Sequence, residues 1–316
     1  MLSATLGFFV LAAMTATLLT HALAQATRLT PIWGAPMILV LAAFLYQCRN
    51  EWTRIFHAAH PVASSRETPA LTVLAIVTGA LTTFILANAV GLGPVVGASL
   101  VGAIGALIAR NKAAAVYCGA FVGMVSQDCL YASTHVTLAA LLAAAVFLLA
   151  APVFNGFGGK LGTIAFIGCV AMAWLTGNPL SQAPIPAANV KALIVLFSVA
   201  ASMGTFSLST RLKLGPVMAS ALVGLAGGLL LPPLMPETGP MLAVVVICAS
   251  FTGMSSRERL ADERRLALAG LITGLIFIFT LPAMGGAGGK LGTIAFASSL
   301  AAKSLADRAT HRSKDE

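Results

Sequence analysis

The sequence predicts an all-α polytopic membrane protein with about twelve transmembrane elements, a five-plus-five inverted repeat and glycine-rich broken or re-entrant helices. Three observations predict this class: an apolar composition, regularly spaced apolar runs and recurring motifs. Of the 316 residues, 58% are hydrophobic and 9% are charged. Soluble domains carry about 25% charged residues. The composition therefore excludes a soluble enzyme, a nucleic-acid-binding domain and a disordered chain.

The apolar runs set the expected elements. In chain order they cover 4–23, 31–48, 69–89, 92–109, 113–126, 136–153, 161–176, 190–209, 214–233, 239–255, 265–284 and 291–304. A helix needs about 20 apolar residues to cross a bilayer. The runs 113–126, 161–176 and 291–304 are shorter than this, so we expect tilted, broken or re-entrant elements there.

The charges predict the topology. If every run crosses and the N-terminus is inside, only Arg28, Lys191 and Lys290 of the 19 Lys and Arg residues lie outside. Basic residues accumulate on the cytoplasmic side of membrane proteins. We therefore expect a bacterial-type inner (plasma) membrane with both termini cytoplasmic. The net charge of +9 is spread between apolar runs, which indicates topology and no nucleic-acid partner.

Enzyme and metal signatures are missing from the sequence. The five cysteines form no CxxC pair, and no HExxH, GxSxG or P-loop pattern occurs. We therefore expect no catalytic residues, no metal site and no cofactor.

Motifs recur in the same order along the chain. Gly93-Pro94-Val95 returns as Gly215-Pro216-Val217, and the Phe-x-Gly-Met-x-Ser stretch at 121–126 returns at 251–256. The stretch 156–166, which contains Gly-Gly-Lys-Leu-Gly-Thr, returns at 286–296 with one change. We therefore divide the chain into two peripheral N-terminal helices with a cytoplasmic loop (1–68), repeat 1 (69–176), repeat 2 (190–304) and a cytoplasmic tail (305–316).

The two repeats are predicted to lie in opposite orientations. Each holds five elements, and an odd number of crossings inverts the second copy. Basic residues also change loops between copies: Arg110 and Lys112 follow the second element of repeat 1, whereas Arg211 and Lys213 follow the first element of repeat 2. Inverted repeats are typical of secondary transporters, although this is an analogy at fold level.

The Gly-Gly-Lys-Leu-Gly-Thr motifs are the candidate substrate site. Pro152 and Pro282 should end the preceding helices, Thr163 can cap the next helix, and a helix start with a lysine can hold an anion. The alternative is a lysine that snorkels to the membrane interface. The candidate binding residues are Gly158, Gly159, Lys160, Gly162, Thr163, Gly288, Gly289, Lys290, Gly292 and Thr293.

Four more candidate residues lie at the ends of the Phe-x-Gly-Met-x-Ser stretches or just after them. Ser126 and Ser256 would line the substrate pathway, or would simply allow close helix packing. Asp128 and Glu258 would bind a coupling proton or Na⁺, or would be solvated loop charges.

These observations together indicate a secondary active transporter of a small anion, for example a carboxylate, coupled to H⁺ or Na⁺. An anion channel and a non-transporting membrane scaffold are the alternatives. The expected partners are the anion, the coupling ion and the lipid bilayer, with a homodimer left open.

Overall fold

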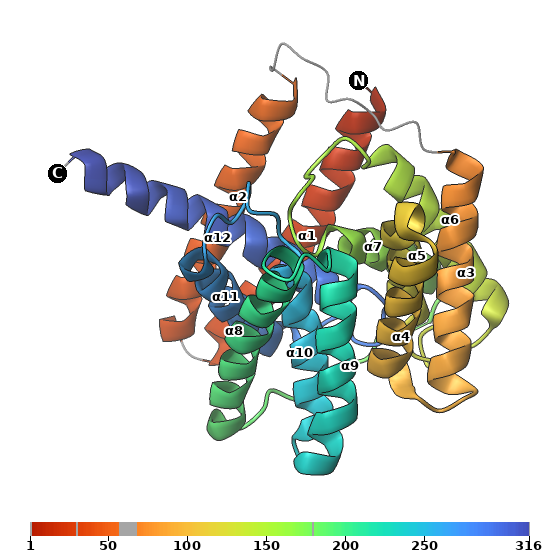
Figure 1. The fold of residues 1–316 in the computed structure, drawn as a ribbon. Helices are drawn as coiled ribbons and strands as arrows, with labels where there is room; N and C mark the ends of the chain where they lie inside the picture. Colours follow the sequence, from red (N-terminus) through yellow and green to blue (C-terminus); the bar gives the residue numbers. More distant parts are fainter. Residues whose placement is uncertain (1, 30, 57–67, 179, 316) are drawn as a thin grey trace.

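The computed structural model describes residues 2–315 except 30, 57–67 and 179. Most of the expected cytoplasmic loop before residue 68 therefore lies outside the described residues. Within the described part the chain is helical (Figure 1), and its elements are α1 (Leu2–Leu29), α2 (Pro31–Phe56), α3 (Pro69–Asn88), α4 (Gly93–Ile108), η1 (Arg110–Lys112), α5 (Ala113–Gly123), α6 (Ser133–Leu149), α7 (Lys160–Thr176), α8 (Ala188–Thr210), α9 (Pro216–Leu234), α10 (Gly239–Gly253), α11 (Glu263–Thr280) and α12 (Lys290–Asp315).

Several helices are suited to a membrane. Five of the described helices, α1, α2, α3, α8 and α9, are long and apolar enough to cross one. The helices α4, α6, α7 and α10 are apolar but shorter. With 11 residues, α5 is about 16 Å long, roughly half of the 30 Å hydrocarbon core. The protein is therefore an all-helical, multi-pass membrane protein with a short element where the sequence predicts one.

The helices α3–α7 and α8–α12 pack in corresponding ways. Helix α3 contacts α5 and α6, and α8 contacts α10 and α11. The two groups meet through α4 against α9 and through α7 against α12, with smaller contacts of α5 with α9 and of α10 with α4. Each contact between the groups thus joins equivalent helices or occurs twice with the groups exchanged.

The first helix contacts both groups, and the second packs against α1 and α12. Helix α1 contacts α6, α7, α11 and α12, and its Leu11, Leu18 and Leu19 are fully buried. We expected this helix to be peripheral, whereas it lies against both groups. Helix α12 extends to Asp315 and its C-terminal end projects from the bundle (Figure 1), so the expected tail continues the last helix.

Hydrogen bonds and ion pairs between polar side chains join segments at the ends of the helices. Four of the contacts between different segments of the described chain are Lys112 Nζ to Thr72 Oγ1 at 2.9 Å, Arg259 to Glu51 at 2.6 Å, Arg265 to Asp307 at 2.6 Å, and Arg211 to Glu263. Each of them joins two segments that the charge pattern places on the inner side.

Candidate functional site

The two lysine motifs meet where α7 and α12 begin. The first residues of these helices are Lys160 and Lys290. Each follows a glycine with positive φ, 84° at Gly159 and 86° at Gly289, which other residues rarely adopt. The sequence thus predicted correctly that a chain break precedes a helix start at both motifs.

The capping role expected for Thr163 is wrong. The N-cap is Gly159, four residues earlier, because the left-handed turn at Gly159 already brings Lys160 into the helix. The hydroxyl of Thr163 instead donates to the Gly159 carbonyl at 3.4 Å, and Thr293 makes the same bond to Gly289. Both threonines are fully buried, so their hydroxyls are used within their own helices.

The motif glycines let four backbones approach one another. A Cβ added to Gly162 would lie 2.5 Å from the Cα of Gly292. One added to Gly158 would meet the carbonyl oxygen of Phe251 at the end of α10, and one at Gly288 would meet that of Phe121 at the end of α5. Protein atoms therefore fill the crossing itself, and any ligand must bind beside it.

The two motif lysines bond to the end of the preceding helix or to the loop that follows it. Lys290 Nζ donates to the carbonyl oxygens of Thr280 at 2.6 Å and Ala283 at 2.5 Å. Lys160 Nζ donates to Asn155 Oδ1 at 2.8 Å and the Ala151 carbonyl at 3.5 Å. Lysines favourably bind carbonyls at helix C-termini. Neither lysine has an acidic partner among the described residues.

A cavity of about 280 Å³ lies beside the second motif. Its lining includes Lys290 and the glycine segment 285–289. Aromatic side chains, Phe121, Phe251 and Phe277, form much of the remaining wall. The structure thus places one motif lysine, with a 9% exposed side chain, at an apolar cavity.

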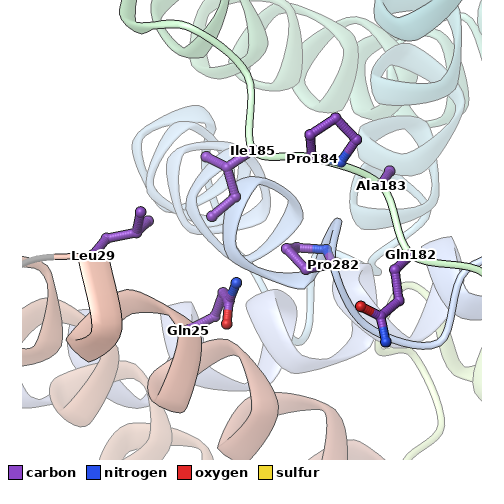
Figure 2. Close-up of a pocket in the computed structure, with 7 residues that line it drawn as sticks. All are labelled: Gln25, Leu29, Gln182, Ala183, Pro184, Ile185 and Pro282. Carbon is purple, nitrogen blue, oxygen red and sulfur yellow. The ribbon is translucent and has the colours of Figure 1, made fainter.

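A second and more open pocket of about 420 Å³ lies next to this cavity. Figure 2 shows it between Gln25 and Leu29 of α1, the segment 182–185 and Pro282. Ala183 lines both spaces. The segment between α7 and α8 therefore separates the open pocket from the cavity.

The remaining candidates lie apart from the cavity lining. The hydroxyls of Ser126 and Ser256 are buried and have no hydrogen-bond partner within the part of the chain that the structure describes. Their backbone N–H groups donate to Gly286 and Gly156 of the opposite repeat, each at 2.8 Å. Asp128 and Glu258 are exposed, which fits solvated loop charges.

Sequence reasoning missed a buried ion pair near Lys160. Arg259 Nη1 lies 2.6 Å from Glu51 Oε1, and these side chains are 7% and 2% exposed. Arg259 Nε also donates to the Asn155 carbonyl at 2.8 Å, and its guanidinium lies 4.4 Å from the centre of the Phe157 ring. Burial lowers the pKa of Arg259, and the Glu51 carboxylate opposes this shift. The pair connects α2 to the loop that precedes the first motif.

The apolar runs, the charge pattern and the repeated motifs did not reveal this ion pair. Glu51 lies outside the repeat, and the residue equivalent to Arg259 in the first copy is Cys129. A lone acidic residue near the end of an apolar run was the only hint.

Comparisons with family models, with curated proteins and with solved structures return no match. The fold and site therefore define the class: a multi-pass helical membrane protein with a buried lysine that lines a cavity and has no acidic partner among the described residues.

Proposed function

We propose that this protein is a secondary active transporter of a small anion, such as a carboxylate, coupled to H⁺ or Na⁺. Alternating access would take place around the two Gly-Gly-Lys-Leu-Gly-Thr motifs. The observation that carries the proposal is Lys290, a buried cation without an acidic partner at a cavity beside the motif crossing.

The reciprocal contacts support an inverted repeat. Gly162 meets Gly292, and the Ser126–Gly286 bond is matched by the Ser256–Gly156 bond. Contacts between equivalent residues, or exchanged in pairs, are what a two-fold axis requires. With five elements in each copy, an axis in the membrane plane makes the two motifs approach from opposite sides.

The polar contacts are compatible with the twelve proposed elements, and the proposal that both termini lie inside rests on the charge pattern. The four contacts between helix ends each join segments assigned to the inner side. Asn178 Nδ2 donates to the Cys129 carbonyl, and Ser181 pairs with Gly285 through the backbone. These four residues belong to segments assigned to the outer side. A wrong crossing count in the middle of the chain would place such partners on opposite sides.

The topology has a matched test. Asp128 and Glu258 are exposed and equivalent, and the five native cysteines are buried. In sealed right-side-out vesicles, we expect a membrane-impermeant maleimide to label Asp128→Cys and to label Glu258→Cys only after permeabilisation. Labelling of both before permeabilisation would contradict the inverted repeat.

The function is tested by uptake into liposomes. A carrier should give saturable anion uptake driven by a proton or Na⁺ gradient, and Lys290→Ala should reduce it at least tenfold. Lys191→Ala, in the first turn of α8, is the matched control and should leave uptake unchanged. Large unitary currents without gradient coupling would indicate an anion channel. If Lys160→Ala and Lys290→Ala both leave every transport phenotype intact, the scaffold alternative remains.

A further inference from the structure

We infer that the cavity beside Lys290 is the substrate site and that it takes a monocarboxylate with an apolar body. This inference rests on the proposed transport function and narrows its substrate class. It excludes inorganic anions and dicarboxylates as the preferred ligands.

The first argument is the charge of the cavity. An ammonium group has three donors, and two of those of Lys290 are bonded to Thr280 and Ala283. A buried charge without an opposite charge is costly, and no carboxylate pairs with this lysine in the described part of the chain. One carboxylate would take the third donor and neutralise the charge. A second carboxylate would find no cation in the lining.

The second argument is the wall of the cavity. Phe121 and Phe251 lie with ring centroids 4.4 Å apart, and Phe277, Val95 and Ile294 continue the apolar surface. A hydrated inorganic ion would lose water against this wall, and the apolar side chains would offer it no donors in return. An aromatic or branched aliphatic body would instead replace water on it.

The third argument is size. A cavity of roughly 150 Å³ is enough to hold a benzene molecule. The volume of about 280 Å³ therefore accommodates one ring with a short carboxylate arm. The open pocket lies on the other side of Ala183, with the amides of Gln25 and Gln182 at its wall (Figure 2).

The test uses the purified full chain in detergent micelles, with phenylacetate, succinate and inorganic phosphate as probes. A ligand that binds the folded state raises the melting temperature. Phenylacetate should raise it, whereas succinate and phosphate should not. Lys290→Ala should weaken phenylacetate binding roughly 10- to 100-fold, since a charge-assisted bond is lost, and Lys191→Ala should not change it.

A second variant keeps the test independent of folding, because Lys290 also bonds the end of α11. Val244 is half-buried and lines the cavity. Val244→Phe leaves the lysine contacts in place and should reduce phenylacetate binding at least tenfold by filling the space. Its melting temperature without ligand should stay near that of the parent protein.

The outcomes separate this inference from the transport proposal. If phosphate or succinate binds through Lys290 and phenylacetate does not, the substrate class is wrong while anion transport stands. If no anion binds in a Lys290-dependent way, both fail. If Val244→Phe leaves phenylacetate binding unchanged, the ligand binds elsewhere and the cavity is not the site.

Discussion

The Glu51–Arg259 pair gives the sharpest stability prediction. Both side chains are buried, and their charged atoms lie 2.6 Å apart. Removing one member of a buried pair costs about 3–5 kcal/mol, because the other charge remains buried without compensation. We therefore compare Glu51→Gln, Arg259→Met and the double variant.

The remaining partners set the order of the effects. Without Glu51, Arg259 keeps the Asn155 carbonyl and the Phe157 ring, so Glu51→Gln should cost about 3 kcal/mol. Without Arg259, Glu51 keeps a 3.3 Å bond from Gln47 and an exposed Arg54 at 3.6 Å. Arg259→Met, however, also removes the bond to the Asn155 carbonyl and the contact with the Phe157 ring, so it should cost more, about 4 kcal/mol. The double variant leaves no orphan charge and should cost less than the sum of the singles by about 2–3 kcal/mol.

The assay is SDS-induced unfolding in micelles, followed by tryptophan fluorescence. Trp52 is adjacent to Glu51 in α2 and packs against Phe8 at a ring distance of 5.2 Å, so it reports on this region. If the two single effects add within about 0.5 kcal/mol, the charges are not coupled, and the reasoning about a buried pair is refuted.

Three further predictions concern other contacts in the structure. Gly162→Ala should destabilise the fold by about 3 kcal/mol or more, because rigid backbone occupies the space that its Cβ would need. The control Gly204→Ala has nothing within 4 Å of its added Cβ and should not destabilise the fold. Equal melting temperatures of the two variants would contradict this prediction. Ser181 and Gly285 exchange backbone hydrogen bonds of 2.9 and 2.8 Å, which implies a Cα separation of about 5.5 Å. Cysteines at both positions should therefore form a disulfide that blocks uptake until a reductant is added. Unchanged uptake by the oxidised protein would show that this segment does not move. Asn155→Ala removes the 2.8 Å bond to the first motif lysine and should cost about 1 kcal/mol, with a smaller effect on unfolding than either ion-pair variant.

Much of the helical framework was predictable from local signals. The Gly-Pro pairs start α4 and α9, the prolines at 152 and 282 follow the ends of α6 and α11, and the lysine motifs open α7 and α12. These features depend on backbone preferences of a few adjacent residues. A single sequence carries such preferences directly, and the repeat displays each of them twice.

The contacts of the site were less predictable because they join distant segments. The sequence placed Lys160 and Lys290 at helix starts, but their bonds to carbonyls at the end of the preceding helix or in the loop that follows it depend on how each loop folds back. The role of Thr163 was wrong because the helix is capped at a left-handed glycine, Gly159, four residues before Thr163. The cavity is formed by residues from both repeats, so no local sequence pattern predicts it.

The asymmetry between the repeats bears on the proposed transport cycle. The Asn155 carbonyl accepts from the Arg259 side chain, whereas the equivalent Gly285 carbonyl accepts from the backbone of Ser181 in the segment between the repeats. One loop is thus held by a buried ion pair, and the other by a backbone bridge next to the open pocket. The proposed carrier would need two states of similar energy, so its two closures would have to be of comparable strength although they are chemically different. Weakening the ion pair should therefore favour opening at the Lys160 side, and linking Ser181 to Gly285 should prevent opening at the Lys290 side.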